Sequence, residues 1–186
     1  MSEETPLATK RRARKIYRVL GEVFPYAHAE LDFTNPFELL VATVLSAQTT
    51  DIRVNAVTPQ LFERYPDPES MAQASEVELQ ELIRPTGFYK NKARALLGLS
   101  QALVEDHDGQ VPDTLEELVK LPGVGRKTAF VVLGNAFGVP GITTDTHVIR
   151  LANRLGWTDS TNANVVERDI GGLFEPKDYT ELSHRL

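Results

Sequence analysis

The 186-residue sequence contains no cysteine. Without a thiol the chain cannot form a disulfide framework, a thiolate zinc site, a cysteine nucleophile or a cysteine-ligated iron–sulfur cluster. No apolar run approaches the length needed to cross a bilayer. The basic residues near the N-terminus are not followed by the apolar segment of a secretory signal. These absences favour a soluble cytoplasmic protein with no membrane partner.

Acidic side chains outnumber basic ones by 26 to 20, which gives a net charge of −6 at pH 7 with histidine neutral. An acidic balance argues mildly against general binding of nucleic acid. The basic side chains, however, are concentrated in residues 1–20, 84–94 and 120–127. Each stretch taken alone is interpreted most simply as solvated helix surface. If the fold brings them together, a net-negative protein can still present a basic face.

No segment alternates polar and apolar residues with the period of a strand, whereas helix signals occur along the whole chain. Asn35 followed by proline is typical of a helix start. The pairs Ser75–Glu78 and Thr114–Glu117 match the capping box. The sequence therefore predicts an all-α protein. Helices are predicted over 9–24, from 36, over 51–65, after 67, after 75, over 88–107, after 114, over 126–137, 145–155 and 162–174, and from about 178.

The segment LPGVGRK at 121–127 joins an amphipathic helix to a strongly apolar one. Gly123 and Gly125 permit a positive φ and a close approach of another backbone. The first N–H groups of the second helix then point outward as an anion site, beside the positive charge of Arg126. A helix–hairpin–helix of this kind holds a DNA phosphate without reading the base sequence. Gly-Val-Gly alone is weak evidence, because any hairpin of two helices could contain it.

Lys127 lies in the first turn of the predicted helix 126–137, which is apolar on nearly every face and is expected to be buried. Burial, the helix N-terminus and the neighbouring Arg126 all favour a neutral amine. Such an amine attacks carbon centres and forms Schiff bases. The alternative is a lysine that only contacts phosphate or reaches out to water. The residues alone leave both interpretations open.

Asp145 precedes the predicted helix 145–155 in the segment TTDTHVIR at 143–150. A plain N-cap accounts for an aspartate in this position. A carboxylate in a cleft facing a lysine could also accept its proton and stabilise a developing cation. His147, two residues further on, is interpreted as structural.

Several motifs share the order found in one protein family: LDFTNPFELL at 31–40, LSAQTTD at 45–51, GFYKNKA at 87–93, GQVP at 109–112, LPGVGRKTA at 121–129 and TDTH at 144–147. On these motifs the sequence resembles the endonuclease III family, within the helix–hairpin–helix DNA glycosylase superfamily. The resemblance implies two all-α lobes with a cleft between them. One lobe is a six-helix barrel over 29–139 that contains the hairpin, and the other joins 1–28 to 140–186.

The resemblance also implies an activity, that of a bifunctional DNA glycosylase and abasic-site lyase in base excision repair. The partner would be double-stranded DNA with damaged or abasic nucleotides, bound by a monomer with the target nucleotide flipped out. Lys127 looks like the amine that attacks C1′, displaces an oxidised pyrimidine and leaves a Schiff base, from which β-elimination cuts the strand. Asp145 looks like the carboxylate that activates this lysine.

Further site residues follow from the same motifs. Gln48 resembles the residue that fills the gap left by the flipped nucleotide, with an ordinary glutamine at a helix end as the alternative. Phe88 occupies the position of an apolar wedge between base steps, and core packing is its alternative. The other expected DNA contacts are Gly123, Gly125 and Arg126 at the phosphate, and Lys90 and Lys92 along the backbone.

One departure from the family is clear. Its members normally end with a four-cysteine loop that binds a [4Fe–4S] cluster, and this sequence has no cysteine. We therefore expect no metal site and no bound cofactor in these 186 residues, and we expect that the sequence is truncated before such a loop. A non-catalytic or weakened DNA-binding fragment is accordingly the alternative function.

Overall fold

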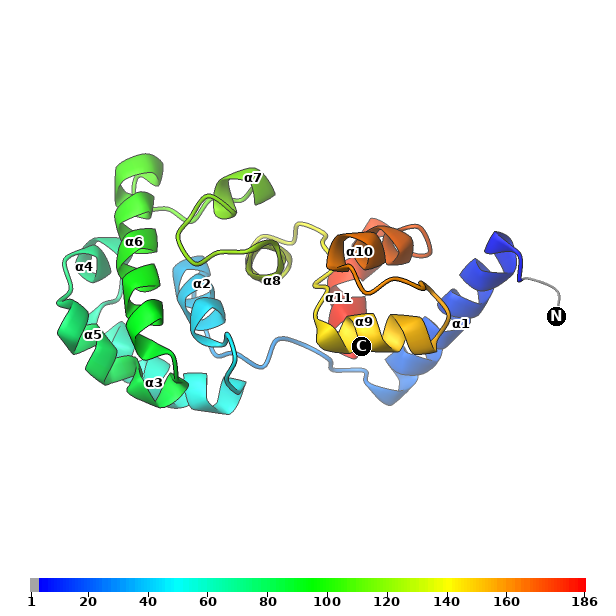
Figure 1. Cartoon of the computed structure of the whole chain (residues 1–186), viewed down its shortest axis with the longest axis horizontal. Coiled ribbons are helices and arrows are strands. Elements are labelled where there is room, and N and C mark those ends of the chain that lie inside the picture. The colour runs from blue at the N-terminus through cyan, green and yellow to red at the C-terminus, as the bar shows by residue number, and fades with distance from the viewer. Residues whose placement is uncertain (1–3) are drawn as a thin grey trace. The chain divides into compact units, whose positions relative to one another are not determined.

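A computed structural model of the chain describes residues 4–186, and every regular element in this range is a helix (Figure 1). The all-α prediction is confirmed, and no predicted helix boundary differs from the structure by more than three residues. The α-helices are α1 (Pro6–Val23), α2 (Pro36–Leu45), α3 (Asp51–Arg64), α4 (Pro68–Ala72), α5 (Glu76–Ile83), α6 (Tyr89–His107), α7 (Leu115–Leu118), α8 (Arg126–Ala136), α9 (Thr146–Arg154), α10 (Ala163–Gly171) and α11 (Tyr179–Arg185). The 3₁₀ turns are η1 (Arg84–Thr86) and η2 (Pro176–Asp178).

The start of α2 follows from local sequence. The Asn35 side chain accepts the backbone N–H of Glu38 at 2.9 Å, as its N-cap position predicts. The Glu38 carboxylate in turn accepts the backbone N–H of Thr34 at 2.6 Å and so closes the entry to the helix. Pro36 opens the helix with a φ that is already helical.

The two predicted capping boxes turned out differently. The Thr114 hydroxyl accepts the N–H of Glu117 at 3.4 Å, which is one half of a box. In the described part of the chain Ser75 makes no side-chain capping hydrogen bond, so the box predicted there is wrong. Glu78 accepts instead from Arg64 of α3 at 2.8 Å. The carboxylate that the local pattern assigned to the cap thus accepts a hydrogen bond from another helix.

The chain divides into two units, Met1–Ala29 with Pro140–Leu186, and Glu30–Val139. The predicted divisions follow residues 28 and 139, and in the structure the divisions follow Ala29 and Val139.

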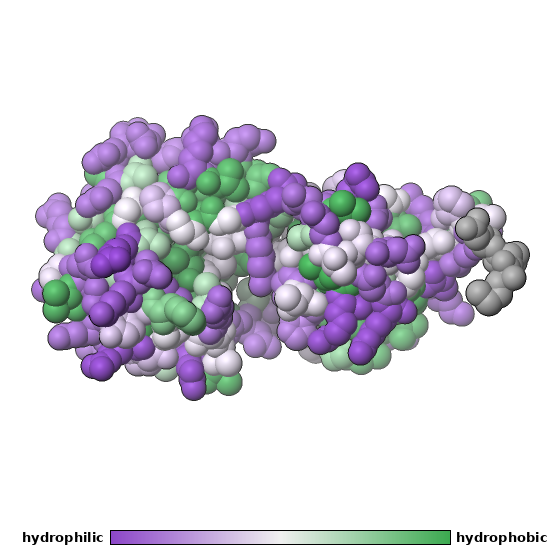
Figure 2. Space-filling view, viewed as in Figure 1, coloured by the Kyte–Doolittle hydropathy of each residue, from purple (hydrophilic) through white to green (hydrophobic). Residues whose placement is uncertain are grey.

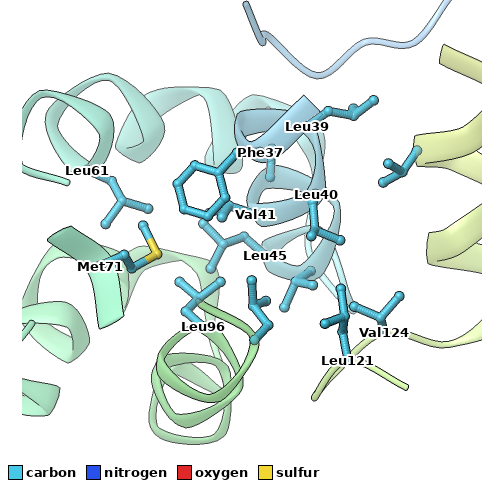
Figure 3. Close-up of a cluster of buried hydrophobic side chains, with 14 of the residues drawn as sticks. Phe37, Leu39, Leu40, Val41, Leu45, Leu61, Met71, Leu96, Leu121 and Val124 are labelled. Carbon is cyan, nitrogen blue, oxygen red and sulfur yellow. The ribbon is translucent and has the colours of Figure 1, made fainter. Parts of the chain in front are cut away.

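The unit Glu30–Val139 is built around α2. Every residue from Leu39 to Leu45 is buried, because α3, α6 and α8 all pack against this helix. Figure 3 shows its apolar side chains among those of the surrounding elements, with Leu121 and Val124 of the 119–125 segment on the Leu40 side. Burial of one such side chain contributes about 1.5–3 kcal/mol to folding. These contacts anchor the turn before α8 to the core.

The unit Met1–Ala29 with Pro140–Leu186 has its own core, in which α1 joins the C-terminal helices. Phe174 contacts two other aromatic rings of this unit, with its ring centroid 5.2 Å from that of Trp157 and 5.7 Å from that of Tyr17 in edge-on arrangements. Tyr17 also donates a hydrogen bond to Glu181 at 2.6 Å. The N-terminal helix is thus held to Phe174 by an aromatic contact and to α11 by a hydrogen bond.

The surface is mixed in character. Hydrophilic side chains cover much of the face seen in Figure 2, with hydrophobic side chains among them. Exposed apolar residues such as Ile52 and Val77 are ordinary when they occur singly. Within residues 4–186 no helix combines the length and the apolar character that a bilayer-spanning segment needs.

Candidate functional site

The turn between α7 and α8 has a shape that requires glycine at one position. Gly123 has a φ of +77°, in the left-handed region, and a Cβ there would lie only 2.8 Å from the Cβ of Ala95. Any larger residue would be strained by its backbone and by this contact. The close approach predicted for the hairpin glycines is therefore present at Gly123, where the turn rests on α6.

Gly125 is different, because nothing in the described structure lies within 4 Å of the position that its Cβ would take. It is the N-cap of α8, with an extended backbone, and it has no side chain to accept the first N–H groups of the helix. The open space and the positive end of the helix dipole together suit an anion at this point. The two glycines of the predicted anion site therefore differ, because Gly123 makes a close contact and Gly125 leaves open space.

Lys127 and Arg126 form the first turn of α8, and both are exposed. The expectation that helix burial would desolvate Lys127 is wrong for the chain by itself. Only Ala129, Val132 and Leu133 of α8 are buried, so the helix has one buried face and its first turn projects from the core. Arg126 lies over the ring of Phe130, with its guanidinium carbon 4.8 Å from the centroid.

Asp51, the first residue of α3, is electrostatically coupled to Lys127 within the same unit. Burial raises the pKa of Asp51 above its usual value, the negative charge of Glu30 raises it further, and the positive charge of Lys127 opposes both. Sequence reasoning missed this carboxylate as a site residue. Its only signal was its place at the end of the motif at 45–51, because the electrostatic effect on Asp51 comes from a residue 76 positions further along the chain.

Asp145 is the N-cap of α9, as predicted. Its Oδ1 accepts the backbone N–H groups of His147 at 2.8 Å and Val148 at 2.9 Å. Two hydrogen bonds to one oxygen fix the orientation of the carboxylate at the start of the helix. The His147 ring contacts the Arg150 guanidinium at 3.1 Å between Nδ1 and Nη2.

Gln48 and Phe88 share an unusual backbone conformation, with φ of 55° and 48°. Positive φ is rare outside glycine, and for a bulky residue such as Phe88 it indicates strain that the surroundings must hold. The Phe88 side chain is 65% exposed, so core packing does not explain it. The two residues line one hollow of about 350 Å³. Its other lining residues are Val44, Ala47, Asn91, Lys92, Ala95 and Gly123.

The two lysines of the motif at 87–93 differ in placement. Lys90 is exposed and stands beside Phe88 on the surface, where it is accessible to a bound partner. Lys92 is only 6% exposed, and its Nζ donates to the carbonyl oxygens of Leu45 and Thr86, both at 2.8 Å. The prediction that Lys92 contacts a nucleic-acid backbone is wrong, because its ammonium points into the protein. Burial lowers the pKa of Lys92.

The ligand set of the [4Fe–4S] cluster does not fit this chain, because the sequence has no thiolate to offer. Within residues 4–186 no group of three or more histidine, aspartate or glutamate side chains is placed to hold a metal ion.

Comparison with known proteins gives consistent matches. Residues 41–176 match the family model described as HhH-GPD superfamily base excision DNA repair protein. Endonuclease III of Synechocystis sp. is 50% identical over 175 residues, which span 94% of this chain and 80% of that protein. Endonuclease III of Bacillus subtilis is 48% identical over 170 residues, which span 90% of this chain and 77% of that one.

Solved structures give the same result. A trapped covalent intermediate of endonuclease III with DNA superposes with a TM-score of 0.91 at 44% identity, covering 95% of this chain and 83% of that one. A non-covalent complex of endonuclease III with DNA gives the same TM-score and identity. A thermostable thymine-DNA glycosylase, at 20% identity and a TM-score of 0.80, shares the fold.

Proposed function

The chain belongs to the HhH-GPD superfamily of base excision DNA repair proteins, and we propose that it is a DNA glycosylase with abasic-site lyase activity that uses Lys127 as its nucleophile. The observation that carries the proposal is the exposed lysine in the first turn of α8, two residues after the glycine N-cap of that helix. A phosphate bound at the helix start would bring the sugar of the same strand to the lysine amine. The partner is double-stranded DNA with damaged or abasic nucleotides, which locates the protein with chromosomal DNA in the cytoplasm or nucleoid.

The phosphate site is built from backbone rather than from side chains. Gly125 leaves the first N–H groups of α8 open to a ligand, and Gly123 allows the turn to approach α6 closely. Arg126 adds a positive charge beside them. Contacts of this kind hold a DNA strand in register and read no bases.

The reaction then proceeds at C1′ of the deoxyribose. The neutral Lys127 amine forms a bond to C1′ while the glycosidic bond to an oxidised pyrimidine breaks, and the base leaves with a proton. Ring opening gives a Schiff base between Lys127 and C1′. Removal of a proton from C2′ then expels the 3′ phosphate by β-elimination and cuts the strand. Because Lys127 is exposed in the chain alone, DNA lying over it would supply the desolvation that favours the neutral amine.

Asp145 is the carboxylate in this scheme. It takes the proton that Lys127 must lose before attack, and its charge offsets that of the cationic sugar and the Schiff base. The two backbone hydrogen bonds from α9 hold the carboxylate in one orientation, so little side-chain entropy is lost during the reaction.

Gln48 and Phe88 open the duplex. A flipped nucleotide leaves a gap and two unstacked base steps, which a polar side chain and an apolar wedge can fill. The exposed side chains of these two residues at one hollow have the chemistry for these two tasks.

A non-catalytic DNA-binding fragment remains the alternative function, but no observation favours it, since the amine and the carboxylate that the reaction needs are both present.

The test is borohydride trapping with a duplex that contains one abasic site. Reduction of the Schiff base should join protein and DNA covalently, and Lys127→Ala should abolish the adduct. Lys177→Ala is the matched control, because Lys177 is also an exposed lysine and lies outside the proposed site, paired with Glu175 at 3.0 Å. If the folded protein forms no adduct, the proposed lyase activity is refuted.

A further inference from the structure

Lys92 is a buried lysine whose charge is satisfied by two carbonyls from different elements. It lies in the first turn of α6, and its Nζ donates to Leu45 O, at the last residue of α2, and to Thr86 O, at the last residue of η1. Carbonyls at the ends of helices often lack an intrahelical donor, and a cation there also suits the helix dipole. One ammonium therefore ties two chain segments to α6.

Each of these carbonyls comes shortly before a residue with strained backbone. Gln48 follows Leu45 by three residues, and Phe88 follows Thr86 by two. The backbone N–H of Lys92 also donates to the carbonyl of Phe88 at 3.1 Å. Strained conformations persist only where surrounding contacts over-determine them. The Lys92 bonds are such contacts, and they act on both segments at once.

A lysine at this position lowers the stability of the fold more than an apolar residue would, if it serves only to fill space. Burial of a charge opposes folding unless hydrogen bonds compensate, and burial lowers the pKa of Lys92 accordingly. Methionine has a similar length and could fill the same space without that penalty. What methionine cannot do is donate to Leu45 and Thr86 together.

We infer that Lys92 is a positioning residue, which sets Gln48 and Phe88 at one fixed spacing through its bonds to Leu45 O and Thr86 O. The inference rests on the proposed role of these two side chains in opening the duplex. A brace of this kind means that the gap-filling residue and the wedge enter the DNA as one preformed unit. Lys92 itself touches no DNA in this arrangement.

The test compares Schiff-base trapping on two substrates, an abasic site in a duplex and the same site in a single strand. A single strand has no stack to open, so it needs Lys127 but not the spacing of Gln48 and Phe88. We expect Lys92→Met to lower the trapping rate on the duplex by about 10- to 100-fold, and to leave the rate on the single strand close to that of the unaltered chain. Lys177→Met should change neither rate.

A double-mutant cycle separates positioning from general damage. In a chain that already carries Gln48→Ala and Phe88→Ala, Lys92→Met should lower the duplex rate no further. An equal loss on both substrates, or a full additional loss in this background, would overturn the inference. Absence of trapping by the unaltered chain would instead refute the proposed function, so the two failures are distinguishable.

Lys92→Cys provides the second route if Lys92→Met does not fold. Because the sequence has no other cysteine, alkylation of the unfolded chain with bromoethylamine creates a lysine analogue at this position alone. After refolding, the aminoethylated protein should regain the duplex rate, and a neutral alkyl group of equal length should not. Equal duplex rates for the two refolded proteins, or failure of the aminoethylated protein to refold, would contradict the role of the ammonium.

Discussion

The Cα of Gly123 faces the side chain of Ala95 so closely that a Cβ on the glycine would lie 2.8 Å from the Cβ of the alanine. With a φ of +77°, Gly123→Ala combines this overlap with backbone strain. We expect the substitution to lower the free energy of unfolding by about 1–3 kcal/mol. Urea denaturation measures the loss. Ala95→Gly in the same chain should recover the steric part only, so complete recovery would contradict the backbone argument.

Substitution of Gly125 by aspartate is expected to raise stability and to lower DNA affinity. Aspartate is a slightly better N-cap than glycine, and the space at this position is open, so Gly125→Asp should raise the free energy of unfolding by a few tenths of a kcal/mol. Its carboxylate would occupy the anion site and repel phosphate, so DNA affinity should fall by about tenfold or more. Gly125→Asn caps equally well without the charge. Equal losses of affinity for both variants would argue against electrostatics at this helix start.

Most of the fold was predictable because the signals for its elements are local. Proline, asparagine and aspartate before apolar runs determine where α2, α4 and α9 begin, and these starts do not depend on distant residues. The exception at Ser75 shows the limit. The Glu78 carboxylate could accept from the backbone at Ser75 or from Arg64 of α3, and in the structure it accepts from Arg64. A capping pattern in the sequence does not show which donor the carboxylate will accept from.

The surroundings of the candidate site residues were less predictable than the fold. The apolar composition of α8 suggested that Lys127 is buried, but composition does not reveal which face meets the core. Lys92 was predicted to contact DNA from its place in the motif at 87–93, while its partners are the carbonyls of Leu45 and Thr86, which no side-chain pattern encodes. The positive φ at Gln48 was equally hidden, because glutamine carries no turn signal.

His184 makes the stability of the chain sensitive to mild acid. Burial lowers the pKa of His184 below its usual 6.5, and the nearby charge of His28 lowers it further. Between the folded pKa and 6.5 the unfolded chain therefore binds more protons than the folded one, so stability should fall as the pH drops through this window and level off below it. Urea denaturation at a series of pH values measures this trend. His184→Gln should flatten it, and an unchanged profile would assign the effect elsewhere.

The Asp145 carboxylate caps α9 and is proposed to act in catalysis, and a single substitution can separate these two roles. Oδ1 caps α9 through the N–H groups of His147 and Val148, and the negative charge is the part proposed to act on Lys127. Asparagine keeps the capping oxygen and removes the charge, so Asp145→Asn should preserve stability and DNA affinity while slowing borohydride trapping by about 100-fold or more. Asp145→Ala should add a stability loss of about 1 kcal/mol from the missing cap. If Asp145→Asn traps DNA at the unaltered rate, Asp145 is an N-cap only, and another carboxylate must take the proton from Lys127. Asp51 is then the residue to replace next, because the charge of Lys127 already influences its pKa.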